Sequence, residues 1–257
     1  MLIGAGDIAQ CGTLGASLTA AVLDVFAGTV FAAGDIAYNS GTAAEFANCY
    51  DPHWGRHKAR TRPVPGNHEY QSPGAGPYYD YFGSNAGTDR TGYYSYTVGP
   101  WLVLALNSEV VHSDSSAQVG WIRNQLSGFP GRCVAAIWHR PLFSSGPHQG
   151  DVDIRPLWRA LYDANVDLVI NGHEHIYERF AAQDPDGRAD PTKGMRQFTV
   201  GTGGAALTSV TAVRSNSEVR GVAWGVTEFT LSSAGYAWHF HPAVGFTFSD
   251  YGFGECH

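Results

Sequence analysis

The sequence of 257 residues predicts an α/β fold, because short apolar runs alternate with helix-like segments over its first two thirds. The last third shows mostly strand patterns. In addition, side chains that can bind metal follow several of the apolar runs directly, as expected where ligands bind beyond the carboxyl ends of strands. No low-complexity linker interrupts the pattern, so we expect one domain over residues 1–257.

Glycine and other turn residues divide the first half of the chain into short elements. Runs of four to seven mostly apolar residues have the length of strands, whereas a helix is indicated where leucine and valine recur every three or four residues. The strands expected here are 2–5, 29–33, 62–65, 93–98 and 101–107. The expected helices are 14–26 and, shorter, 42–49.

The same reasoning continues through the second half. Residues 116–126 predict an amphipathic helix, and 154–165 a further helix. The strands expected here are 133–138, 166–170, 196–200, 222–231 and 236–240. Residues 232–235 are suited to close a hairpin between the last two strands.

Composition and charge exclude several classes of protein. The formal net charge is −7 and the pI is about 5.8, so the basic footprint of a nucleic-acid-binding protein is absent. No apolar run approaches the length of a membrane-spanning helix. The chain opens MLIGAGD, without a signal peptide, and we expect a processed form of a secreted or extracytoplasmic protein.

The four cysteines support that location. Cys11, Cys49, Cys133 and Cys256 are widely spaced and form no CxxC pair, so a zinc knuckle is not indicated. An even number of distant cysteines suits two disulfides in an exported protein, and three connectivities are open. Four unrelated buried thiols are the alternative.

Five apolar runs end in residues that can bind metal. These residues are Asp7, Asp35, Asn67 with His68, His139, and His173 with His175. A single aspartate at a strand end is more often a cap or turn residue, but turn chemistry does not explain five such positions in series. Carboxylate, amide and imidazole donors suit Zn, Mn and Fe. The set exceeds the needs of one ion and fits two cations about 3.5–4 Å apart, an arrangement that hydrolyses phosphate esters.

The ordered motifs resemble those of the calcineurin-like metallophosphoesterase superfamily. They are GD (6–7), GDIAY (34–38), GNHE (66–69), WHRP (138–141) and GHEHIYER (172–179). The resemblance implies a four-layer sandwich of two mixed β-sheets flanked by helices, with metals at the strand ends. Many members carry Asp-x-His in the first motif, whereas here Ala9 takes the place of that histidine. Tyr38, three residues after Asp35, is instead similar to the tyrosinate ligand of the purple acid phosphatase branch.

This resemblance implies two sets of ligands that share Asp35. One metal would be held by Asp7, Asp35, Tyr38 and His175, and the other by Asp35, Asn67, His139 and His173. The usual metals of the branch are Fe(III) beside the tyrosinate and Zn, Mn or Fe(II) in the other position. A free tyrosine has a pKa of about 10, so a phenolate at neutral pH needs a strong Lewis acid such as Fe(III). The alternative for Tyr38 is a packed tyrosine at a strand end.

Two further histidines match positions of the family that face the substrate. His68 lies inside GNHE, and His148 follows His139 by nine residues. The resemblance implies attack by a metal-bound hydroxide, with Asp35 fixing the geometry and both histidines supporting the leaving side. A solvated loop histidine is the alternative for His148, because Gln149 replaces the second histidine frequent in the family.

The leading interpretation is therefore a dinuclear-metal phosphatase acting on small phosphate monoesters. A phosphodiesterase with the same site is the first alternative. The second is a non-catalytic secreted binding protein on this fold. If Asp7 and Asp35 share a metal, the segments that follow them are neighbours, which favours the pairs Cys11–Cys49 and Cys133–Cys256. The sequence does not give the oligomeric state.

Overall fold

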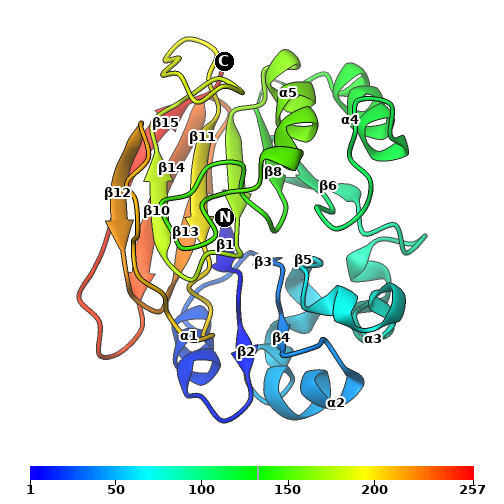
Figure 1. Cartoon of the computed structure of the whole chain (residues 1–257), viewed down its shortest axis with the longest axis vertical. Coiled ribbons are helices and arrows are strands. Elements are labelled where there is room, and N and C mark those ends of the chain that lie inside the picture. Colours follow the sequence, from blue (N-terminus) through cyan, green and yellow to red (C-terminus); the bar gives the residue numbers. More distant parts are fainter. Residues whose placement is uncertain (132) are drawn as a thin grey trace.

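The computed structural model describes residues 1–131 and 133–257, and two large β-sheets dominate it (Figure 1). Within these residues the first sheet has six strands in the order β15-β14-β13-β1-β3-β5. The second has seven in the order β12-β10-β11-β9-β8-β7-β6, and β2 pairs with β4 separately. Both large sheets are mixed. For example, β1 runs parallel to β3 and antiparallel to β13.

The bounds of the elements follow chain order. The strands are β1 (Leu2–Ala5), β2 (Ala9–Gln10), β3 (Thr29–Ala33), β4 (Ala37–Tyr38), β5 (Thr61–Val64), β6 (Tyr94–Val98), β7 (Trp101–Ala105), β8 (Val134–Ile137), β9 (Leu168–Asn171), β10 (Tyr177–Phe180), β11 (Arg196–Val200), β12 (Ser217–Gly221), β13 (Gly225–Leu231), β14 (Gly235–Pro242) and β15 (Tyr251–Glu255). The α-helices are α1 (Gly15–Leu23), α2 (Ala43–Glu45), α3 (Gly76–Phe82), α4 (Ala117–Gly128) and α5 (Arg155–Asp163).

Three apolar clusters define the layers. Phe31 from the first sheet and Ile170 and Phe198 from the second belong to one buried cluster between the sheets. The outer face of the first sheet packs against α1 and α3, and the outer face of the second against α4 and α5. In Figure 1, α4 and α5 lie at the upper right and α1, α2 and α3 at the bottom. This arrangement confirms the expected four-layer α/β sandwich.

Most expected elements are present, with shifted ends. The first helix ends at Leu23 rather than at residue 26. In the segment 42–49, Thr42 accepts a hydrogen bond from the Glu45 backbone as an N-cap, but α2 has only three residues before the chain continues as a π-helical turn, Phe46–Tyr50. The expected hairpin is present, since β13 pairs with β14 around the turn at residues 232–234.

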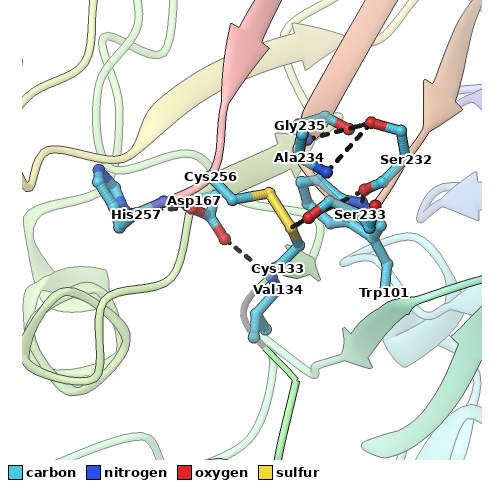
Figure 2. The surroundings of a disulfide bond; sticks show 10 residues. All are labelled: Trp101, Cys133, Val134, Asp167, Ser232, Ser233, Ala234, Gly235, Cys256 and His257. Carbon is cyan, nitrogen blue, oxygen red and sulfur yellow. Dashed lines mark hydrogen bonds and ion pairs between the residues drawn. A yellow bond between two sulfur atoms is a disulfide. The ribbon is translucent and has the colours of Figure 1, made fainter.

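Both preferred disulfides, Cys11–Cys49 and Cys133–Cys256, are confirmed. Cys256 directly follows the edge strand β15 of the first sheet, and Cys133 directly precedes β8 of the second (Figure 2). Beside this bond, buried Asp167 accepts the backbone N–H of Val134 at 2.8 Å and that of His257 at 2.8 Å. The disulfide and Asp167 therefore both connect the C-terminal strand to the sheet that carries His139.

Asp250 makes a second connection between the sheets. Its side chain accepts hydrogen bonds from Tyr177 Oη (2.7 Å) and Arg179 Nε (2.7 Å) on β10 and from Trp238 Nε1 (3.0 Å) on β14. Burial opposes the charge of this carboxylate, but the hydrogen bonds from Arg179 and Tyr177 outweigh burial and lower its pKa.

Replacing Asp250 with alanine should lower the free energy of unfolding by about 3 kcal/mol, because it removes one partner of a buried ion pair. Asp250→Asn keeps an acceptor oxygen, so it should lower the free energy of unfolding less than Asp250→Ala does. Since the folded-state pKa of Asp250 is lowered, the stability from its charge is present above the unfolded pKa and is lost as the pH falls through the folded one. Urea unfolding should therefore show that the difference in free energy of unfolding between wild type and Asp250→Asn becomes smaller below about pH 4. A gap that stayed constant down to pH 2 would contradict this account.

Candidate metal centre

The predicted ligand residues lie at one edge of the two sheets. Five of them lie two or three residues after the carboxyl end of a strand. These residues are Asp7 (after β1), Asp35 (β3), Asn67 (β5), His139 (β8) and His173 (β9). Tyr38 lies at the end of the short strand β4, and His175 two residues after His173. Strands that run parallel bring their carboxyl ends to the same edge, which explains this convergence.

Three atoms that can bind metal surround the hydroxyl of Tyr38. Tyr38 Oη lies 2.7 Å from Asp7 Oδ1, 3.2 Å from Asp35 Oδ2 and 3.0 Å from His175 Nε2. His175 Nε2 is also 3.1 Å from Asp7 Oδ1. We call Asp7, Asp35, Tyr38 and His175 the tyrosine cluster. It contains every residue expected for the first metal.

A second group surrounds His139. His139 Nε2 lies 3.1 Å from Asp35 Oδ2, 3.2 Å from Asn67 Oδ1 and 3.2 Å from His173 Nδ1. Asp35, His139 and His173 place one donor atom each within 4.8 Å of one another. We call these residues and Asn67 the histidine cluster. Asp35 belongs to both clusters, because its Oδ2 lies 3.2 Å from Tyr38 Oη and 3.1 Å from His139 Nε2.

The two predicted substrate-facing histidines flank the clusters. The ring of His68 lies 4.3 Å from that of Tyr38, and its Nε2 is 3.7 Å from Asp35 Oδ2. The ring of His148 lies 4.5 Å from that of His173, and its side chain is 54% exposed. Both imidazoles therefore border the donor atoms while remaining accessible to a ligand from solvent.

The backbone is strained at three of the strand ends. Asp7, Asp35 and His173 have φ values of 58°, 48° and 71°, a region that residues other than glycine seldom adopt. Gly34 also has a positive φ (80°), and a Cβ there would lie 2.4 Å from His139 Nδ1. Strain of this kind persists where the surrounding structure enforces it, commonly at functional sites.

Several contacts fix the orientation of the donors. His139 Nδ1 bonds to the carbonyl of Ala33 at 2.9 Å, and His175 Nδ1 to that of Ala206 at 2.6 Å. The opposite nitrogens of these rings, Nε2, therefore face the clusters. Contacts of this type set the tautomer of metal-binding histidines.

Glu69, the last residue of GNHE, has no role among the residues predicted from the motifs. Its buried carboxylate accepts the backbone N–H groups of Ile36 (2.8 Å), Ala37 (3.2 Å) and Gly66 (2.8 Å). Glu69 thereby ties the loop after Asp35 to the loop that carries Asn67. An acidic residue inside the GNHE motif was the available signal. Its partners Ile36 and Ala37, however, lie 33 and 32 residues away along the chain, so the sequence pattern does not reveal these contacts.

Without metal, protons balance the buried charges. Burial disfavours a charged imidazole, but Asp35 and Asp7 outweigh it and raise the pKa of His139 to about 10 and that of His175 to about 9. Burial together with the charges of Asp7 and Asp35 raises the pKa of Tyr38 well above its usual range. Burial and the neighbouring charge of His139 lower the pKa of His173. The hydroxyl of Tyr38 then donates to Asp7 in the metal-free protein.

The donor set fits two cations of the hard-to-borderline class. The two clusters share Asp35. Together they contain two carboxylates, one amide oxygen, three imidazoles and one phenol. Oxygen and imidazole donors suit Fe, Zn and Mn, and no cysteine joins them among the described residues, because all four cysteines are paired.

Together, the sandwich fold and this donor set at the strand ends are typical of metal-dependent phosphoesterases. The chain belongs to the calcineurin-like phosphoesterase family, whose model matches residues 4–177.

Individual relatives lie in the purple acid phosphatase branch. The chain is 28% identical over 229 residues to probable purple acid phosphatase 20 of Arabidopsis thaliana, covering 76% of this chain and 53% of that protein. It is 26% identical over 183 residues to purple acid phosphatase 15 of the same plant, covering 57% of this chain and 34% of that protein. The chain thus spans about half or less of the length of these relatives.

Solved structures share the fold. Purple acid phosphatase PPD1 from yellow lupin matches with a TM-score of 0.78 at 17% identity, over 97% of this chain and 53% of that one. GAP50, described as the anchor in the inner membrane complex of Plasmodium, matches with a TM-score of 0.73 at 17% identity, over 97% of this chain and 87% of that one. In the part of this chain that the structure describes, no helix is long and apolar enough to cross a membrane.

Proposed function

We propose that this protein is a metal-dependent phosphatase that hydrolyses small phosphate monoesters at a dinuclear centre. The observation that carries the proposal is the position of Asp35. Its Oδ2 lies 3.2 Å from Tyr38 Oη and 3.1 Å from His139 Nε2, so one carboxylate oxygen belongs to both donor clusters. Paired cations that share a carboxylate suit displacement at phosphorus, where the attacking and leaving oxygens both need stabilisation.

The tyrosine cluster would hold Fe(III), and the histidine cluster Zn, Mn or Fe(II). The phenol of Tyr38 favours a trivalent ion, because only a strong Lewis acid ionises a buried tyrosine whose pKa is already raised. Bound metal ions would supply the acidity that activates water and would polarise the oxygens of the ester.

The chain's own residues would place the substrate. Asn67 is fixed beside His139, and Asp35 Oδ1 accepts the backbone N–H of His68 at 2.8 Å, so the GNHE loop is tied to the bridging carboxylate. His68 then presents its imidazole next to Tyr38, on one flank of the clusters. His148 lies on another flank, beside His173. Either imidazole can donate a hydrogen bond to a phosphate oxygen or a proton to the departing alkoxide.

The single most informative experiment combines metal analysis, a visible spectrum and two substrates. We expect two metal ions per chain, one of them iron, with an absorption band from tyrosinate bound to Fe(III). We also expect p-nitrophenyl phosphate to be hydrolysed at least about tenfold faster than bis-p-nitrophenyl phosphate, a difference of about 1.4 kcal/mol in barrier height. The reverse preference would establish a phosphodiesterase with the same site.

A non-catalytic binding protein remains the second candidate, favoured by one observation: the fold matches GAP50, whose description is that of an anchor. The complete set of donors argues against it here. Stoichiometric metal without turnover of either substrate would favour the binding protein. The two disulfides support a secreted or extracytoplasmic location, and the acidic net charge of −7 supports a small-molecule substrate rather than nucleic acid.

A further inference from the structure

Glu174 is a buried acid to which neither the fold nor the ligand clusters give a role. It lies between His173 and His175, and its side chain is 0% exposed. A buried carboxylate is costly unless it has a partner, and Glu174 Oε2 lies 3.2 Å from Nδ1 of His148. The pair joins the β9–β10 loop to the loop at residues 141–151.

Residues other than Glu174 also hold the backbone around His148. Ser145 donates its N–H to buried Glu178 at 2.8 Å. Arg214 donates to the carbonyls of Ser144 (3.1 Å) and Gln149 (2.8 Å), on either side of the histidine. These bonds fix where the loop runs. They do not fix the rotation of the exposed imidazole, whose only hydrogen-bond partner among the described residues is Glu174.

The carboxylate of Glu174 is itself seated against the loop. A Cβ at Gly146 would lie 2.2 Å from Glu174 Oε2, so any larger residue there would displace the carboxylate. With Nδ1 bonded to Glu174, the Nε2 of His148 lies on the opposite side of the ring. The ring itself lies alongside that of His173, 4.5 Å away and tilted by 34°.

We propose that Glu174 is a positioning residue that holds the imidazole of His148 beside the histidine cluster, with Nδ1 bonded and Nε2 directed to the leaving group of the substrate. The inference rests on the proposed phosphatase function. When the P–O bond of the ester breaks, the bonding electron pair goes to the departing oxygen, which takes the Nε2 proton of the doubly protonated ring. The neutral ring that results stays bonded to Glu174 through Nδ1–H. Glu174 acts only through His148 and does not touch the substrate.

A double-mutant cycle on two monoesters tests this role. With phenyl phosphate, whose leaving group is poor, His148→Ala and Glu174→Ala should each lower kcat by about 30-fold with little change in KM. With p-nitrophenyl phosphate, whose leaving group needs little help, both losses should stay below about fivefold. The double variant should show the same decrease in kcat as His148→Ala alone, because Glu174 has no effect once its partner is gone. Glu174→Gln keeps an acceptor oxygen and should stay within about threefold of wild type.

Gly146→Ala supplies a second perturbation that leaves both partners in place. It should displace the carboxylate and reproduce the larger loss on phenyl phosphate. Equal losses on both substrates, additive losses in the double variant, or fewer metal ions per chain in Glu174→Ala would overturn the proposal.

A measurement without turnover separates this proposal from the phosphatase function. In the zinc-loaded protein at a pH where the ring is neutral, a long-range ¹H–¹⁵N spectrum should show His148 as the Nδ1–H tautomer. Glu174→Ala should shift it toward the Nε2–H form, while Glu178→Gln should not. A tautomer unchanged in Glu174→Ala would contradict the positioning role. A wild type inactive on both esters, with the tautomer shift observed, would contradict only the phosphatase function.

Discussion

Replacing Asp35 with asparagine should reduce turnover of p-nitrophenyl phosphate by at least about a thousandfold, or roughly 4 kcal/mol in barrier height. Asp35 is the one residue shared by the tyrosine and histidine clusters, through Oδ2. The amide has no negative charge, so it cannot neutralise two cations. Steady-state kinetics and elemental analysis should show activity and metal content falling together.

The matched control is Asp163→Asn, at the exposed C-terminal end of α5. It makes the same chemical change at an exposed residue that belongs to neither cluster, and it should leave kcat and metal content as in wild type. Near-wild-type turnover and two bound metals in Asp35→Asn would exclude the proposed centre. Circular dichroism checks that each variant is folded. Asp35→Glu keeps the negative charge, so it should bind more metal than Asp35→Asn even if its turnover stays well below that of wild type.

Metal loading should tighten steeply as the pH rises. In the metal-free protein His139, with a pKa of about 10, and His175, with a pKa of about 9, carry protons at pH 7, and so does Tyr38. These ligands must lose their protons to bind metal, and each proton released changes the apparent affinity about tenfold per pH unit. His173 has a lowered pKa and releases none. Filling both positions should therefore become about a thousandfold more favourable from pH 6 to pH 7.

Titration calorimetry in two buffers of different ionisation enthalpy counts the protons directly. We expect about three protons released per chain when both metals bind at pH 7. Tyr38→Phe should release one proton fewer and should lose the absorption band of the iron-loaded protein. Metal binding that is independent of pH between 6 and 8, or an unchanged band in Tyr38→Phe, would refute the assignment of Tyr38 as a ligand.

The sequence predicted the fold and the meeting of the donors because both depend on order along the chain. Asp7, Asp35 and His139 each follow an apolar run, and parallel strands bring such positions to one edge of a sheet. The disulfide Cys11–Cys49 followed from the same neighbourhood.

The parts that sequence did not predict depend on contacts through space. The bond between Glu174 and His148 joins residues 26 positions apart, and no spacing rule connects them. Strand β15 has the sequence YGFGE, whose glycines weaken the strand pattern, and its pairing with β14 identifies it. Helix α3 begins with Gly76 and Pro77, and its buried residues Tyr78 and Phe82 pack into the apolar cluster that contains α1. In each case a tertiary contact decides the local structure.

The place of β1 in the first sheet has a consequence for biosynthesis. This strand leads to Asp7, two residues beyond its end, and lies between β3 and β13, so its two neighbours are separated by nearly 200 residues of chain. As the chain is made, every donor through His175 is synthesised before Gly225–Leu231 can complete the pairing of β1. Pairings of this separation form late, because a long loop must close first. The nascent chain therefore holds all the predicted donor residues before β1 is paired on both of its edges.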